Sequence, residues 1–174
     1  MKRTVIRFAL ITAALVASAC SKESISPEDL FNANVKVAQT TIKTRGGDYE
    51  DTVTSFPQVA VYRKSDIKGK SWFTANSGGR MVYDFFFLSL YFDNIDKMKV
   101  GDTLKSSRFM FTFPASSDSR ASTYEYGGKI TLAGKGDDYV ILRFHNFQVS
   151  CIFGDYLTDG YLYCPLFEEY VTVE

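Results

Sequence analysis

The residue with the most distinctive chemical setting is Cys20, which closes an apolar run and follows the small residues 17–19. The chain begins with the basic stretch Met1–Arg3, and residues 8–17 are uncharged and mostly apolar. That order is typical of an export signal. The run is well below the roughly 20 residues that cross a bilayer as a permanent helix. Cys20 could therefore be a core thiol, half of a disulfide or a modified N-terminus.

The segment Ala17-Ser18-Ala19-Cys20 resembles the lipobox of bacterial lipoproteins, in which the cysteine becomes the N-terminus and carries acyl chains. This resemblance implies a signal peptide over residues 1–19 and lipidation of Cys20. Several acyl chains together give stable anchoring, which a single chain does not. A plain secretory signal with a chance cysteine is the alternative. Ser21 stands where an Asp would imply inner-membrane retention, so the resemblance favours the outer membrane of the cell envelope.

Cys151 and Cys164 are the two other cysteines, and an exported domain lies in a compartment that permits disulfides. Their pairing depends on the turn between them. A two-residue turn at Asp159-Gly160 would place Cys151 opposite Glu168, whereas a four-residue loop over 156–159 would place it opposite Cys164. The alternative is two buried thiols that pack as small apolar side chains.

Catalytic and metal-binding chemistry finds little support in the sequence. His145 is the only histidine, which excludes multi-histidine metal sites. Acidic residues are frequent in predicted loops, but neither a spacing nor a motif selects a pair, so solvated turn residues are the default interpretation. We expect no catalytic residues, no metal and no cofactor. A small hydrolase based on loop carboxylates is the weakest alternative.

The aromatic residues offer a second kind of chemistry, because exposed rings can stack against sugars. The chain has 15 Phe, 11 Tyr and one Trp. Alternating Phe residues are best explained as core. Tyr156, Tyr161 and Tyr163 lie beside the predicted Asp159-Gly160 turn and are the surface candidates for ligand stacking, although cross-strand packing would also explain them.

These residues are positioned by short apolar or alternating runs, which indicate strands separated by Gly-, Asp- and Ser-rich breaks. Residues 83–92 are apolar on both faces, as in a covered central strand. The apolar phase changes at His145-Asn146, which predicts a bulge, as does Gly127-Gly128. We expect one all-β domain of about eight to ten strands over residues 34–174, either an antiparallel β-sandwich or a partly closed, lipocalin-like barrel. Residues 20–33 should form a tether containing one short helix that starts at Ser26.

Charge and length narrow the classes of partner. The chain of 174 residues has 20 basic and 20 acidic side chains, and three of the basic ones precede Cys20. A mature chain would therefore be slightly acidic, which argues against nucleic acid as a partner. A chain of this length can bury a sufficient core without disulfides or metals.

Three further stretches are SWFTA at 71–75, KVGDTL at 99–104 and VILRFHNF with LTDGYL between 140 and 162. Together with ASAC at 17–20 they are similar to small outer-membrane lipoproteins of uncharacterised function from Gram-negative anaerobes. The similarity implies a β-rich cell-envelope domain and transfers no catalytic residues. We expect a non-catalytic, lipid-anchored protein with a binding or structural domain. A glycan-binding module of a polysaccharide-capture system is the alternative, and a protein partner is the other class of ligand.

Replacing Cys20 with Ala should release the protein from membranes, because the variant has no thiol to acylate. Fractionation of cells that express the wild type and Cys20→Ala measures this directly. Unchanged membrane association of the variant would contradict lipidation.

Overall fold

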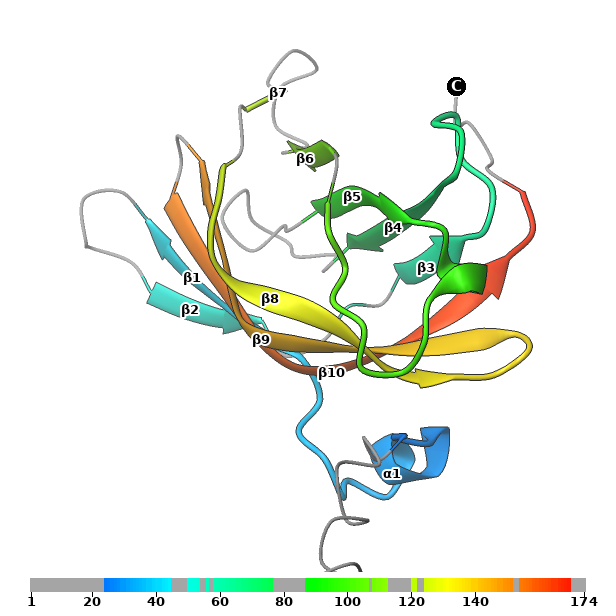
Figure 1. Ribbon diagram of the computed structural model, residues 1–174. Coiled ribbons are helices and arrows are strands. Elements are labelled where there is room, and N and C mark those ends of the chain that lie inside the picture. Colours follow the sequence, from blue (N-terminus) through cyan, green and yellow to red (C-terminus); the bar gives the residue numbers. More distant parts are fainter. Residues whose placement is uncertain are drawn as a thin grey trace, which may run out of the picture.

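The computed structural model describes residues 24–44, 50–53, 56, 58–76, 87–106, 108–112, 120–121, 124–151 and 154–169. Figure 1 shows helix α1 beneath a curled sheet. The elements in chain order are α1 (Pro27–Phe31), β1 (Gln39–Thr44), β2 (Glu50–Val53), β3 (Gln58–Tyr62), β4 (Lys70–Asn76), β5 (Phe87–Asp93), the 3₁₀ helix η1 (Ile95–Lys97), β6 (Arg108–Thr112), β7 (Arg120–Ala121), β8 (Tyr124–Lys135), β9 (Tyr139–Cys151) and β10 (Gly154–Phe167). The all-β prediction is confirmed.

The ten strands form one curled, mixed sheet with the shape of a half-barrel (Figure 1). One hydrogen-bonded path runs in the order β2-β1-β10-β3-β4-β5-β6-β7, and β9 and β8 continue from the other edge of β10. All pairs are antiparallel except β10 with β3, which is parallel. Residues 101–104 pair in turn with β8, through bonds such as Leu104 N to Ile130 O at 2.9 Å.

β10 runs through Asp159-Gly160 without a turn, so the prediction of a turn there is wrong. The chain reverses instead between Cys151 and Gly154, which face each other in the register. Gly160 has φ of +123°, and a Cβ on it would lie 2.6 Å from Val37 O. This glycine is required by the close passage of residues 37–38 over β10, not by a turn.

Both predicted bulges are confirmed. Along β9 the buried positions change from even, ending at Phe144, to odd, starting at Phe147. The register with β10 shifts at the same point, and Asn146 has φ of +46°. On β8 the register shifts on either side of Gly127, and Gly128 has φ of +73°. Each bulge returns the following side chains to the core face of the sheet.

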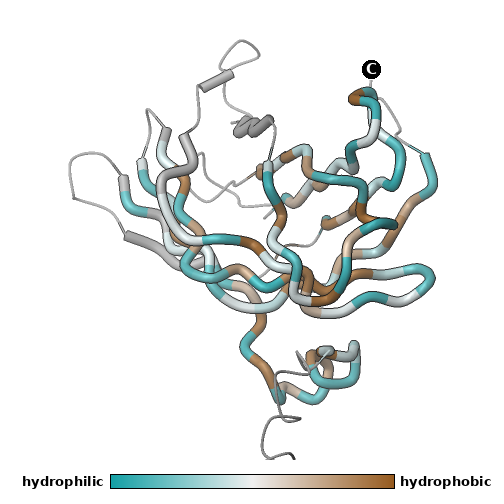
Figure 2. Tube along the Cα trace, in the orientation of Figure 1, coloured by the Kyte–Doolittle hydropathy of each residue, from teal (hydrophilic) through white to brown (hydrophobic). Residues whose placement is uncertain are grey.

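The core lies on the concave face of the half-barrel, and Figure 2 shows how hydrophobic and hydrophilic positions alternate along the long strands. Its largest fully buried side chains are Phe73, Phe92, Phe144, Leu88, Leu90, Ile95 and Leu132. Phe144 contacts Phe73 and Phe147 at centroid distances of 6.2 and 6.0 Å. As predicted, β5 is covered on both faces, because every residue from Leu88 to Phe92 is buried.

Residues 24–33, which were predicted as part of a tether over residues 20–33, are docked on the domain, and residues 20–23 lie outside the described residues. The predicted helix start is present, since Ser26 and Asp29 cap α1 reciprocally. Ile25 N donates to Ala133 O of β8 at 2.9 Å, and Leu30 is buried. The folded unit therefore includes residues from Ile25 on, which lie before the predicted boundary at 34.

Gly69 and Gly128 have nearly equal φ angles, so substituting each one distinguishes the stability cost of backbone strain from that of steric contact. A Cβ added to Gly69, at φ +75°, would meet open space, whereas a Cβ on Gly128 would lie 2.2 Å from the backbone oxygen of Asn146. Gly69→Ala should cost about 1–2 kcal/mol of unfolding free energy from its φ alone. Gly128→Ala should cost roughly 3 kcal/mol or more, because backbone must also move. Urea unfolding of both variants measures the difference, and equal losses would contradict the assigned register.

Candidate functional site

Four aromatic rings form a continuous row on the convex face, one from each of four neighbouring strands. The order is Phe167 (β10), Tyr62 (β3), Trp72 (β4) and Tyr91 (β5), and each ring is the register partner of the next. The centroid distances along the row are 5.4, 4.9 and 6.5 Å, and each pair is stacked with an interplanar angle of 26°. We call these four residues the aromatic row.

Each member of the row stands next in sequence to a core residue, and this fixes the face on which the rings lie. Val61 and Phe73 pair in the register and are completely buried. Because side chains alternate across a strand, Tyr62 and Trp72 must point to the convex face. The row is open at one end, since Phe167 is 48% exposed, and closed at the other, where Tyr91 is 3% exposed.

Polar groups border the row on both sides. At the next outward-facing positions on one side, Lys70 Nζ binds Asp93 Oδ1 at 2.7 Å. On the other side lie Thr74 and Ser89, which are register partners. The indole Nε1 of Trp72 donates to Ser89 Oγ, which fixes the orientation of the Trp ring. An apolar strip bordered by hydroxyl and charged groups can stack on an apolar ligand face and bond to polar groups around it.

The three tyrosines proposed from the sequence do not form one platform. Tyr156 is 2% exposed and belongs to the core, so its candidacy for ligand stacking is wrong. Tyr161 and Tyr163 lie on the convex face, away from the aromatic row. The guanidinium of Arg143 covers the Tyr161 ring at 4.9 Å, and Tyr163 stacks on Tyr139 at 5.5 Å. Trp72 has no sequence signal that separates it from the many other aromatic residues.

Of the two alternatives for Cys151 and Cys164, the structure does not support the disulfide. Cys151 is the register partner of Gly154, and Cys164 that of Val140, near the other end of β10. Ten residues of extended strand separate the two backbone positions by roughly 33 Å, far beyond the reach of a disulfide. Cys164 is a fully buried free thiol, and burial raises its pKa well above the ordinary value. Cys20 lies outside the described residues.

A second polar group lies on the convex face at the β9 bulge. Asp159 Oδ1 accepts from Arg143 Nη1 at 2.9 Å and from the Asn146 amide at 3.3 Å, and Lys36 Nζ lies 3.5 Å from Oδ2. Burial acts to raise the pKa of Asp159, but these hydrogen bonds and the two cations outweigh it and lower the pKa. His145 Nε2 contacts Thr131 Oγ1 at 2.9 Å. Burial, Arg143 and Lys129 lower the pKa of His145.

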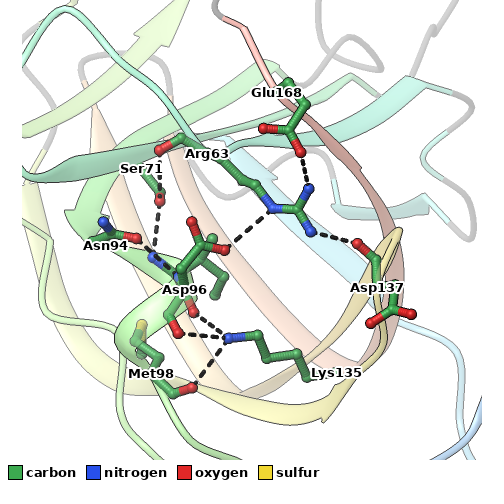
Figure 3. Close-up of polar contacts among 9 residues, drawn as sticks. Arg63, Ser71, Asn94, Asp96, Met98, Lys135, Asp137 and Glu168 are labelled. Carbon is green, nitrogen blue, oxygen red and sulfur yellow. Dashed lines mark hydrogen bonds and ion pairs between the residues drawn. The ribbon is translucent and has the colours of Figure 1, made fainter.

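A third polar group, drawn in Figure 3, joins three loops at one end of the half-barrel. Arg63 binds Glu168 and the Asp137 carbonyl, and its Nε lies 3.2 Å from Asp96 Oδ1. Lys135 Nζ donates to the carbonyls of Ile95, Asp96 and Met98 at 2.7, 3.1 and 3.4 Å. Both cations are occupied by protein acceptors, so this group fastens loops together and offers no free charge to a ligand.

Four of the acidic residues that the sequence left as a weak catalytic alternative are bound to protein partners, and Asp137 and Asp138 are exposed in the loop between β8 and β9. Asp93, Asp96 and Asp159 pair with cations, and Asp155 accepts from Ser150 Oγ at 2.6 Å. Within the described ranges no three His, Cys, Asp or Glu side chains gather as metal ligands would. The helices in those ranges are too short and polar for a membrane span. Asp48 lies outside the described residues.

Comparison of the chain with protein-family models, with curated proteins and with solved structures gave no match.

The lowered pKa of Asp159 predicts an acid-dependent contribution to stability. A carboxyl whose pKa is lower in the folded state stabilises the fold above its ordinary pKa, and this contribution is lost as the pH falls through the folded value. The stability difference between wild type and Asp159→Asn should therefore be largest above about pH 5 and shrink towards about pH 2. Urea unfolding across this range measures it. The exposed Asp66→Asn is the control, and a pH-independent difference for Asp159→Asn would contradict the assignment.

Proposed function

We propose that this protein is a lipid-anchored, non-catalytic cell-envelope module that binds a glycan on its aromatic row. The observation that carries the proposal is the set of four stacked rings on four adjacent strands. Strands lie about 4.8 Å apart, so the accessible part of the row, from Phe167 to Trp72, extends over roughly 10 Å. That length can accommodate more than one sugar ring in line, and the buried Tyr91 supports the row at its closed end.

The chemistry of a sugar ring matches this surface. The carbon-bound hydrogens on the flat faces of a pyranose are apolar and weakly positive, and the faces of aromatic rings are negative. The hydroxyl groups around the sugar need hydrogen-bond partners, which Thr74 on one side of the row and the Lys70–Asp93 pair on the other can supply. Ser89 is buried and holds the Trp72 indole in place. Stacking provides contact area, and the bordering groups provide orientation.

Charge favours a glycan over nucleic acid as the stacked ligand. Aromatic rows also bind single-stranded bases, but such sites combine the rings with a positively charged groove. Beside this row, Lys70 is neutralised by Asp93, and the chain after Cys20 has more acidic than basic residues. Arg108 on β6 is the register partner of Tyr91, so the next basic residue along the row lies beyond its buried end.

The half-barrel supports a binding role of this kind. We propose that the domain is a partly closed barrel and not a sandwich, because one hydrogen-bonded path connects β2 with β7 and residues 101–104 extend the β8 edge. In this arrangement the concave face is used for the core. Ligand recognition is left to the convex face, where the aromatic row lies.

Removing a ring from the accessible part of the row should weaken glycan binding. Tyr62→Ala and Trp72→Ala should each reduce affinity about tenfold, since a stacked aromatic contact contributes roughly 0.5–1.5 kcal/mol beyond its buried area. Tyr62→Phe keeps the ring and should bind nearly as wild type. A glycan array with the full chain in detergent identifies the ligand, and titration calorimetry measures the affinities.

Tyr161→Ala is the matched control, because Tyr161 is also a convex-face tyrosine but lies under Arg143, away from the row. Its affinity should equal that of the wild type. If Tyr62→Ala and Trp72→Ala bind as tightly as the wild type, the glycan binds away from the aromatic row. A wild-type chain that binds no glycan on the array would overturn the glycan proposal.

A further inference from the structure

The N-terminal segment is held on the convex face of β8, β9 and β10 by contacts at both of its ends. Ile25 N bonds to Ala133 O, and a Cβ on Gly134 would lie 2.2 Å from Ile25 O. At the other end, Tyr161 N donates to Lys36 O and Ala38 N donates to Tyr161 O, both at 2.8 Å. The segment between these ends therefore has a fixed position on the sheet.

This segment exposes two large apolar side chains. Phe31 is 76% exposed although its ring lies 6.1 Å from that of Tyr163, and Val37 is 45% exposed where it bridges to Tyr161. Tyr161 and Tyr163 are two residues apart on the same face of β10, so Phe31 and Val37 are neighbours. We call α1 together with residues 35–37 the α1 face (Figure 1).

The attachment point of the chain is close to the same surface. Gly134, Ile141 and Tyr163 are consecutive register partners, so Ile25 above Gly134 and Phe31 above Tyr163 are separated by about 10 Å. Cys20 precedes Ser24 by only four residues, which can span at most ~14 Å. An acylated Cys20 would therefore keep the α1 face within a short distance of the lipid.

We propose that the α1 face rests on the bilayer, with Phe31 and Val37 at the boundary between headgroups and acyl chains. This inference depends on the lipid anchor in the proposed function, but not on the glycan. Aromatic rings favour that boundary, and lipid anchors combine with a small apolar contact to hold an orientation. Lys36 is exposed beside Val37 and Glu28 is exposed on α1, so the face carries both signs of charge and does not require an anionic lipid.

The single tryptophan of the chain allows a direct test. In the wild type Trp72 reports on the aromatic row, and in the double variant Phe31→Trp/Trp72→Phe the only tryptophan reports on the α1 face. Both acylated full-length proteins are reconstituted in phosphatidylcholine vesicles that contain lipids brominated near the headgroup. The tryptophan at position 31 should lose roughly half of its emission, as expected within about 5–10 Å of the boundary. Emission from Trp72 in the wild type should be unchanged.

A second reporter, Val37→Trp/Trp72→Phe, should be quenched like the one at position 31. Flotation of the vesicles separates anchoring from orientation. Proteins that float with unquenched tryptophan at positions 31 and 37 would overturn the docking proposal and leave the anchor intact, as would quenching of Trp72 alone. A protein that does not float would overturn the anchor and this inference with it, whereas glycan binding is measured independently in detergent.

Discussion

The architecture depends on how the two edges of β10 are shared. β9 pairs with one edge along nearly the whole strand, whereas the other edge is divided between β1 over residues 154–159 and β3 over residues 166–167. β1 is antiparallel and β3 is parallel to β10, so the two cannot merge into one continuous neighbour. The sheet divides at this edge and curls, with residues 37–38 crossing over Gly160 where the neighbours change. The concave core and the convex surface both follow from this division.

Local patterns in the sequence predicted local features well. The change of apolar phase at 145–146 and the pair Gly127-Gly128 are visible within a few residues, and both mark bulges in the structure. Asp159-Gly160 has the composition of a turn, but its glycine is explained by residues 37–38, which are far away in sequence. Both registers considered for Cys151 and Cys164 placed the reversal between 156 and 160, whereas the chain reverses between Cys151 and Gly154.

The aromatic row could not be predicted from one strand at a time. Its members come from four strands, and their alignment depends on long-range register, including the parallel contact of β10 with β3. The available signal was that Tyr62, Trp72 and Tyr91 each occupy the phase opposite a strong core residue in a strand. The N-terminal segment was misjudged for a related reason. Its polar composition indicated a tether, yet the buried Leu30 and backbone bonds at both of its ends dock it on the sheet.

The bond between Ile25 and Ala133 also sets an order of events in folding. The first described residues pair with a strand that is synthesised much later, so they cannot dock until β8 has followed. Docking of the N-terminal segment is thus a late step. In the export and acylation that we propose, an acylating enzyme would therefore meet the chain before this segment docks.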